Sequence, residues 1–329
     1  MKTLVTGGAG FIGSHLVERL LVDGHEVVVV DNFCTGLEAN LAAVKNNSRL
    51  KICNEDVADF NGIKNYFGDI DWVFHLAALT SLVPSVEKPL DYFRSNVLGT
   101  ASVLEASRKA GVKRFVYTAS SSCYGIPDKH PTEEAAPIRN EYPYAATKYM
   151  GELFSLHYSR VYKLPVVSLR LFNVYGLRVR TDSGYGAALG VFLAQKANYK
   201  PFTVVGDGTQ TRDFVFVTDV VDAFVRAAAS DCAGEVFNVG SGNPQSVNRM
   251  IELLGPNDIV YVPKRPGEPD QTFADVGKIK KALGWEPCVS FDEGLGIIMK
   301  HAGDWKDAQV WTPEKIQEAT ASWFQHLKK

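Results

Sequence analysis

The stretch Leu4-Val5-Thr6-Gly7-Gly8-Ala9-Gly10-Phe11-Ile12-Gly13 decides the fold of this chain. A short apolar run leads into glycines that satisfy two overlapping patterns, Gly8-x-Gly10-x-x-Gly13 and Gly7-x-x-Gly10-x-x-Gly13, and a helical pattern follows over residues 14–23. A strand, a glycine turn and a helix in this order let backbone N–H groups approach the two phosphates of a dinucleotide, because glycine leaves no side chain in the way. Three glycines can also form a plain turn, but their place between the first strand and the first helix favours a dinucleotide site.

Further strands and helices alternate outward from this loop. Apolar runs of strand length lie at residues 26–30, 51–53, 72–76, 115–118 and 166–170, and helical stretches at 89–110 and 144–162 separate the later ones. Such runs are typical of parallel strands buried on both faces, and right-handed crossovers then give a doubly wound sheet. We predict an α/β fold with a Rossmann-type doubly wound parallel sheet over residues 1–172, with returning segments near 209–240. A smaller mixed α/β C-terminal substrate domain is expected over residues 173–208 and 241–329.

Asp31 closes the second strand, 18 residues after Gly13. A carboxylate at this offset can accept hydrogen bonds from the adenosine ribose hydroxyls and would repel a 2′-phosphate, which favours NAD over NADP. Asn32 follows it, and no cation stands in the next positions to reverse that preference. A lone Asp can also be a turn residue. Asp56, after the third strand, is a weaker candidate for the adenine pocket.

Composition excludes several classes of protein. The 46% apolar and 22% charged residues are ordinary for a globular chain, and the net charge of −2 argues against nucleic-acid binding. We see no apolar run of 18 or more, so no membrane span is expected. The five cysteines are odd in number and lack CxxC spacing, which disfavours a disulfide framework or a metal site. A cytoplasmic location is the simplest expectation.

Tyr144 and Lys148 stand four residues apart in a helical stretch and therefore share one helix face. A free phenol is a poor base at neutral pH, but a nearby cation lowers its pKa. Such a tyrosine can exchange a proton with a substrate hydroxyl while a hydride moves to the nicotinamide. A surface pair is the alternative. The hydroxyl run Ser120-Ser121-Ser122, at the carboxyl end of a strand, favours the catalytic interpretation.

Together these motifs resemble the extended short-chain dehydrogenase/reductase family, and most closely its nucleotide-sugar 4-epimerases of the UDP-glucose and UDP-N-acetylglucosamine type. The resemblance covers nearly the whole chain. It rests on residues 7–13, 75–78, 96, 120–125, 144, 148 and 170–176, and on the C-terminal stretches 206–214, 265–268 and 274–285.

The resemblance implies a role for each matching residue. Tyr144 would be the acid/base, Lys148 would hold the nicotinamide ribose, and Ser120 would hydrogen-bond the reacting sugar hydroxyl. Together with Tyr144 and Lys148, the expected cofactor-binding residues are Gly7, Gly10, Phe11, Ile12, Gly13, Asp31, Asn32, Asp56, Val57, Leu76, Ala77, Ala78 and Asn96. The expected substrate-binding residues are Ser121, Ser122, Cys123, Asn173, Arg212, Arg265, Glu268 and Thr272. Arg212 and Arg265 would bind the diphosphate, although either could instead form an ordinary surface ion pair.

Three functions stay open at this point. An NAD-dependent nucleotide-sugar 4-epimerase, acting through a transient 4-keto sugar, is favoured. A dehydratase shares the first oxidation, but family dehydratases carry an Asp-Glu pair where this chain has Ser121 and Ser122, and serine is too weak an acid to replace a carboxyl group. Cys123 could serve as an atypical acid there, or it could be a small buried filler. A catalytically silent NAD-binding protein is the third alternative.

Two further expectations follow from the resemblance. Thr272 takes the place of the family's gatekeeper beside the sugar C2 substituent, and its small size would leave room for an N-acetyl group. Plain hexoses would then be rejected only modestly. Family members dimerise through two helices per subunit, which match residues 89–110 and 144–162, so a homodimer is expected. In the second helix Met150, Leu153, Phe154, His157 and Tyr158 could form an apolar face, but such a stripe is more often plain core than interface, so the dimer rests mainly on the resemblance.

Overall fold

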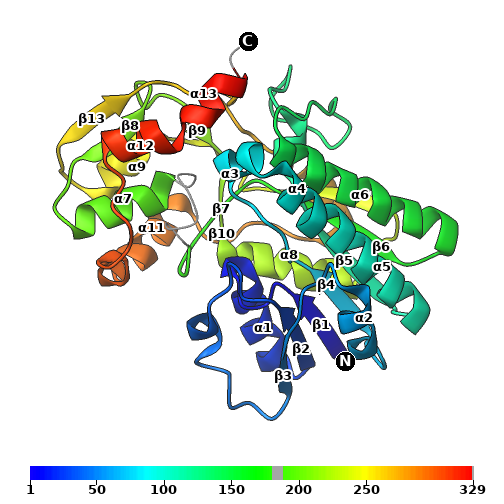
Figure 1. The fold of residues 1–329 in the computed structure, drawn as a ribbon. Coiled ribbons are helices and arrows are strands. Elements are labelled where there is room, and N and C mark those ends of the chain that lie inside the picture. Colours follow the sequence, from blue (N-terminus) through cyan, green and yellow to red (C-terminus); the bar gives the residue numbers. More distant parts are fainter. Residues whose placement is uncertain (180–187, 328–329) are drawn as a thin grey trace.

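A seven-stranded parallel sheet organises the first part of the molecule (Figure 1). The structure is a computed structural model, and it describes residues 1–179 and 188–327. The strand order is β3-β2-β1-β4-β5-β6-β11, which is the doubly wound order expected from the sequence. The strands are β1 (Lys2–Thr6), β2 (Glu26–Asp31), β3 (Leu50–Asn54), β4 (Trp72–His75), β5 (Arg114–Ser120), β6 (Val166–Leu171) and β11 (Glu235–Val239).

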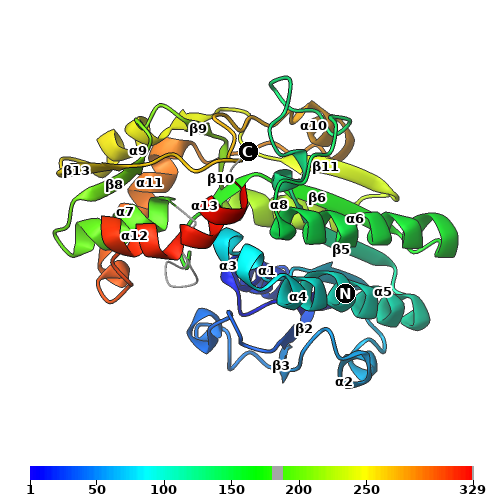
Figure 2. The ribbon, with the colours of Figure 1, turned by 45° about the horizontal axis from the view of Figure 1, so that its top comes forward.

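Alternate residues of each strand face two separate layers of helices, which is why the strands read as continuous apolar runs. Val5, Val29 and Phe74 pack with α1 (Phe11–Val22) and α8 (Val217–Ala229) in one core. Leu4 and Val28 point to the opposite core, with α2 (Phe60–Ile63), α5 (Gly99–Ala110) and α6 (Pro143–Tyr162). Figure 2 shows the helices on both sides of the sheet. The predicted α/β fold is confirmed.

The helical stretch predicted over residues 89–110 is continuous but not uniform. It runs through α4 (Pro89–Tyr92), the π-helical segment η3 (Phe93–Leu98) and α5. Other short helices in this part are η1 (Glu38–Leu41), η2 (Lys64–Tyr66), α3 (Leu82–Glu87) and η4 (Ser121–Tyr124). π-Helical turns occur mostly as single interruptions that re-aim side chains. Here the turn contains Asn96.

Smaller sheets and the remaining helices form the second part around a separate core. The strand pairs are β7 (Asn173–Tyr175) with β10 (Phe214–Phe216), β8 (Phe202–Val205) with β13 (Ile259–Val262), and β9 (Thr211–Arg212) with β12 (Gln245–Ser246). The helices of the described residues 188–327 that lie outside the large sheet's layers are α7 (Ala188–Ala197), α9 (Val247–Leu254), α11 (Phe291–Met299), η5 (Ala302–Trp305), α12 (Pro313–Ala319) and α13 (Ala321–Leu327). The helix α10 (Gly277–Leu283) instead packs against β11 and α8 in the core of the large sheet.

The chain crosses between the two parts more than once. Of the predicted returning segments, α8 and β11 join the large sheet, whereas β9 and β10 pair with strands of the second part. The C-terminal helical stretch is broken at Thr320 into α12 and α13. No described helix combines the length and the apolar character that crossing a bilayer requires.

Candidate active site

The glycine loop forms a tight turn between β1 and α1 that admits no side chains. Gly7 has φ +69°, and a Cβ there would stand 2.7 Å from the backbone nitrogen of Ala77. A Cβ at Gly13 would stand 2.1 Å from the Gly7 carbonyl oxygen. Gly10 is the N-cap residue and has no side chain to cap the helix, and the first N–H groups of any helix lack intrahelical partners. The backbone N–H groups of the first helical residues, Phe11, Ile12 and Gly13, can therefore donate hydrogen bonds to a pyrophosphate.

Asp31 lies at the carboxyl end of β2 and is buried against this loop. Its carboxylate oxygens accept hydrogen bonds from the backbone N–H groups of Ala9 and Phe33, both at 2.9 Å. Burial raises the pKa of the Asp31 carboxyl, and these two hydrogen bonds offset part of that effect. The side-chain oxygen of Asn32, the next residue, accepts a hydrogen bond from the backbone N–H of Cys34 at 3.1 Å. Because each carboxylate oxygen has a second lone pair, Asp31 can still accept ribose hydroxyls.

The loop after β4 packs against the glycine turn. The Thr6 hydroxyl accepts hydrogen bonds from the N–H groups of Leu76 and Ala77 at 3.1 and 3.2 Å, and Ala78 continues the loop. Asn96 is fully engaged with protein groups: its amide bonds both backbone groups of Leu79 and the Thr147 hydroxyl. In this structure Asn96 therefore ties the loop to α6, and its contact with a cofactor stays a prediction.

Asp56 and Val57 follow β3. The Asp56 carboxylate accepts from the N–H of Ala58 at 2.9 Å and pairs with the guanidinium of Arg94. Val57 is buried in the core beneath α5. Asp56 thus follows the carboxyl end of β3, the strand that pairs with β2, and its role in the adenine pocket stays a prediction.

Ser120 and Tyr144 meet at the carboxyl end of β5. Ser120 is the last residue of that strand, and Tyr144 lies in the first turn of α6, where Pro143 stands at the start of the helix. The Ser120 hydroxyl lies close enough to the phenol to lower its pKa by hydrogen bonding. The Ser122 hydroxyl donates to the Ser120 Oγ at 2.8 Å, and Ser121 begins the short helix η4. The predicted hydroxyl cluster is therefore assembled around the phenol.

The electrostatics of Tyr144 differ from the sequence-based expectation. Burial raises the pKa of the phenol, and the Ser120 hydrogen bond offsets only part of that rise. Lys148 places its Nζ 4.6 Å from the centre of the Tyr117 ring. Burial lowers the pKa of Lys148 to about 7, although the Glu152 carboxylate opposes this. In the protein alone, desolvation therefore sets the direction of the Tyr144 pKa shift, and the lowering expected from Lys148 stays a prediction for the protein with NAD bound.

Behind Lys148 lies a buried ion pair. Glu152 and Arg170 are nearly inaccessible to solvent, and their closest contact is 2.6 Å. Arg170 also donates to the Tyr124 hydroxyl at 2.8 Å, and Tyr124 donates in turn to Asn238 of β11 at 2.7 Å. This network anchors the face of α6 that carries Tyr144 and Lys148.

Cys123 lies next to this network in a small apolar cluster with Tyr124, Phe172 and Ala274. The thiol is buried, and burial raises its pKa to about 12. A thiol in this environment is a poor proton donor at neutral pH. The surroundings of Cys123 therefore support the interpretation as a buried filler.

Arg212 and Arg265 converge on one carboxylate. The guanidinium of Arg265 lies 2.8 Å from Glu268, and that of Arg212 lies 4.0 Å from the other oxygen of the same side chain. All three side chains are mostly buried. Two cations share one anion here, so the group keeps a net positive charge that suits a diphosphate.

Thr272 connects this region to Asn173. Its hydroxyl donates to the Asn173 Oδ1 at 3.0 Å and accepts from the backbone N–H of Asp213 at 2.9 Å. Asn173 begins β7 directly after the large sheet. The structure thus brings the predicted gatekeeper beside a second predicted substrate residue.

Sequence reasoning missed three residues of this site. Asp213 is fully buried and accepts hydrogen bonds from Ser241, Gly242 and Ala274, so it fixes the turn beside Arg212. Tyr142 stacks on Tyr144, and Trp323 packs on Tyr142. Asp213 stood within a stretch used for the resemblance, whereas nothing local to residue 323 signals that it returns to the active helix.

Comparison with known proteins decides the family. The model of the NAD dependent epimerase/dehydratase family matches residues 3–240. The chain belongs to this family. The resemblance drawn from the motifs is confirmed. The family is NAD-dependent, and the glycine loop of this chain keeps the cradle for the phosphates of NAD, so the cofactor is NAD.

Individual members of the NAD-dependent epimerase/dehydratase family match most of the chain. The UDP-glucose 4-epimerase of Mycolicibacterium smegmatis is 38% identical over 90% of this chain and 96% of its own. The crystal structure of UDP-glucose 4-epimerase from Thermotoga maritima is 35% identical with a TM-score of 0.86, covering 92% of this chain and 98% of that one. UDP-glucuronic acid 4-epimerase from Bacillus cereus, in complex with UDP-glucuronic acid and NAD, is 34% identical with the same TM-score, covering 92% and 99%.

Proposed function

We propose that this protein is an NAD-dependent nucleotide-sugar 4-epimerase that acts on a UDP-sugar. The observation that carries the proposal is the Ser120–Tyr144 pair at the carboxyl end of β5, with Ser121 and Ser122 in the places where a dehydratase of the family would carry an Asp-Glu pair. The residues of this site can therefore oxidise and reduce C4, but they include no carboxyl pair to eliminate water.

The chain's own residues supply positioning and proton transfer. The bound dinucleotide supplies the hydride acceptor, and its oxidised nicotinamide carries a positive charge. Tyr144 takes the proton of the C4 hydroxyl, which Ser120 orients, and returns it after the sugar has presented its other face. Lys148 stabilises the phenolate. Because epimerisation involves no net oxidation or reduction, bound NAD would not be consumed and would stay in place.

The two ends of the substrate would be held by different parts of the chain. Residues 1–172, with α8 and β11, would form the dinucleotide domain, and residues 173–208 and 241–329 would supply most of the nucleotide-sugar contacts. Arg212 and Arg265 would bind the diphosphate, and Glu268 would meet the nucleotide ribose. Thr272 is small, so UDP-N-acetylglucosamine and UDP-N-acetylgalactosamine should fit, and UDP-glucose and UDP-galactose should react as well. Supply of polysaccharide precursors in the cytoplasm is the corresponding cellular role.

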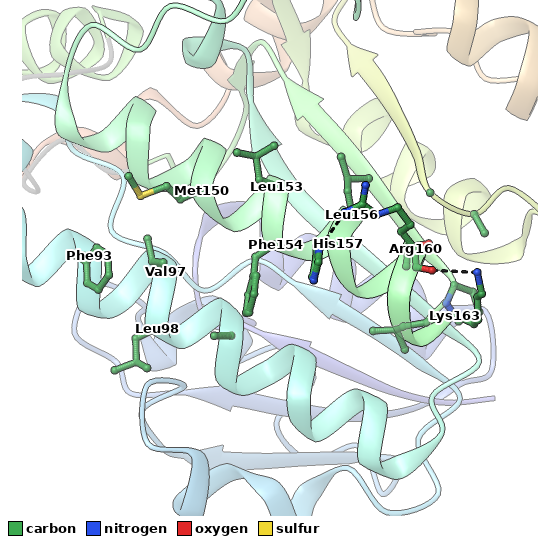
Figure 3. Close-up of a pocket in the computed structure, with 16 residues that line it drawn as sticks. Phe93, Val97, Leu98, Met150, Leu153, Phe154, Leu156, His157, Arg160 and Lys163 are labelled. Atoms are coloured by element: carbon green, nitrogen blue, oxygen red, sulfur yellow. Dashed lines mark hydrogen bonds between the residues drawn. The ribbon is translucent and has the colours of Figure 1, made fainter.

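A homodimer is part of the proposal. Apolar side chains of η3, α5 and α6 stay exposed along a groove of about 1250 Å³. Figure 3 shows Phe93, Val97 and Leu98 on one helical segment, alongside Met150, Leu153 and Phe154 on α6. Tyr158, expected on this face, is instead buried and donates to Glu105 of α5 at 3.2 Å. A second copy of the same helix pair would cover this surface in a four-helix arrangement.

One assay tests the reaction. The purified protein is incubated with UDP-N-acetylglucosamine, UDP-glucose and UDP-glucuronic acid, without added reductant, and the products are read by NMR and mass spectrometry. A C4 epimer of equal mass is expected. Loss of 18 mass units would show a dehydratase, and no change with any donor would contradict the proposal.

A further inference from the structure

The C-terminal helix α13 lies between the two parts of the molecule. Both Figures 1 and 2 show it beside α3 of the first part, and the Ser322 hydroxyl donates to the Glu87 carboxylate of that helix at 2.8 Å. One turn of α13 also carries Trp323, a fully buried side chain. The helix α13 is thus anchored by one buried side chain, while Ala321, Gln325 and His326 stay exposed.

Trp323 holds the segment that contains Arg265 and Glu268. Its indole Nε1 donates to the carbonyl oxygen of Pro266 at 2.8 Å. Pro266 stands between the arginine and the glutamate of the 2.8 Å ion pair. A hydrogen bond from a buried indole to this carbonyl fixes the backbone from which both charged side chains project.

The same indole reaches the catalytic helix through Tyr142. The ring centres of Trp323 and Tyr142 are 5.1 Å apart, at an interplanar angle of 50°. Tyr142 is the N-cap residue of α6, and its ring stacks on that of Tyr144 at 6.5 Å with an angle of 8°. Packed rings at these distances contribute specific contacts beyond simple burial. An unbroken aromatic path therefore joins residue 323 to residue 144.

We propose that Trp323 and Tyr142 are positioning residues that set the spacing between the arginine segment and the Tyr144 phenol. This inference rests on the proposed function, because a substrate held by its diphosphate at Arg265 must present its C4 hydroxyl to Tyr144. The distance between anchor and acid/base then decides how often the hydroxyl is within reach, and misplacement by about 1 Å can cost roughly a hundredfold in rate. The C-terminal helix is thereby part of the active site.

Variants of Tyr142 test the link to Tyr144. Tyr142→Phe keeps the ring stack, whereas Tyr142→Leu removes it and retains an apolar side chain. We expect Tyr142→Leu to lower kcat about tenfold or more, and Tyr142→Phe to stay within about twofold of the wild type. An equal loss in both variants would overturn the inference, because it would assign the effect to the hydroxyl. So would wild-type kcat in Tyr142→Leu.

Trp323→Phe tests the link to the arginine segment. It keeps an aromatic ring against Tyr142 but removes the hydrogen bond to Pro266. We expect KM for the nucleotide sugar and the dissociation constant of UDP, measured by calorimetry, to rise about 3- to 10-fold, with kcat within about twofold. Gln325→Ala, on the exposed side of the same helix, is the matched control and should change neither quantity. Unchanged UDP binding in Trp323→Phe would overturn the inference.

The two proposals fail in different ways. If the wild-type protein turns over no nucleotide sugar, the proposed function is contradicted, while the ratio of UDP dissociation constants between Trp323→Phe and the wild type still decides the role of Trp323. If the wild type is active but neither Tyr142→Leu nor Trp323→Phe differs from it, the positioning role is wrong and the proposed function stands. Thermal unfolding and bound NAD are measured for each variant, and a kinetic loss that only tracks loss of folded, NAD-loaded protein counts against the inference.

Discussion

His75 is buried and neutral. Its ring nitrogens lie 2.7 Å from the Thr6 hydroxyl and 2.9 Å from the Thr100 hydroxyl, and burial, together with the nearby Lys148, lowers its pKa to about 3. Because the folded state resists protonation, the unfolded chain binds more protons between about pH 6.5 and 3. The free energy of unfolding should therefore fall as the pH drops through this window, by on the order of a few kcal/mol. Thermal unfolding against pH measures it. His75→Gln should weaken the fall of the unfolding free energy at acid pH. The same change at exposed His301 should leave that pH dependence unaltered.

The thiol of Cys123 should be dispensable for chemistry. It lies in an apolar cluster, and its raised pKa, about 12, keeps it protonated and weakly acidic at neutral pH. Cys123→Val preserves the packing without the thiol, so kcat should stay within about threefold of the wild type. Steady-state assays with the preferred UDP-sugar measure this. A loss of a hundredfold or more in folded, NAD-loaded protein would instead support the dehydratase-like role for the thiol.

Thr272 should control the size of the C2 substituent. Its hydroxyl bonds Asn173 and the backbone of Asp213, so the side chain has a fixed place beside the proposed sugar pocket. Thr272→Tyr should lower kcat/KM for UDP-N-acetylglucosamine at least tenfold more than for UDP-glucose, because a bulky ring would occupy the space. Thr272→Val removes the hydroxyl without adding bulk and controls for the lost hydrogen bonds. Unaltered turnover of the N-acetylated sugar in Thr272→Tyr would show that this position is not the gatekeeper.

At the scale of elements, the helix pair α5–α6 presents an apolar face that is unusual for a monomer. Phe93 is 51% exposed and Leu153 49% exposed, on neighbouring helical segments. Charges introduced here should oppose burial against a second copy. Phe93→Glu combined with Leu153→Glu should shift the protein to monomer in sedimentation velocity. Val22→Glu, at an exposed apolar residue at the end of α1, is the control. A wild type that sediments as a monomer at micromolar concentration would contradict the proposed dimer.

Local patterns predicted the elements that carry the cofactor loop. The spacing of Gly7, Gly10 and Gly13 reflects contacts within one turn, so the sequence records it directly. The end of the chain is different. The Thr320 hydroxyl donates locally, to the carbonyl oxygen of Ile316, but the burial of Trp323 depends on Pro266, which is far away in the chain. Likewise, the shift of the Lys148 pKa depends on how completely the fold excludes water. Periodicity records which residues are buried, but not which distant residue they meet.

At the scale of the whole molecule, neither part is a single stretch of chain. Phe224 of α8 packs in the core beneath the large sheet, and β11 forms its edge beside β6. A fragment ending at residue 172 would lack both elements and expose that core. The interleaving also means that the dinucleotide site and the arginine segment are held together by several chain crossings, which suits a reaction whose intermediate must not escape.

This closed arrangement makes a prediction about the hydride. If Tyr144 and the bound NAD return to the same sugar what they removed, a UDP-sugar labelled with deuterium at C4 should keep the label at C4 in both epimers. Mass spectrometry and NMR of the equilibrium mixture measure it. A tightly held cofactor also predicts that added free NADH does not dilute the label. Loss of deuterium from C4, or its appearance at C6, would contradict epimerisation and indicate instead the elimination chemistry for which residues 121 and 122 provide no carboxyl group.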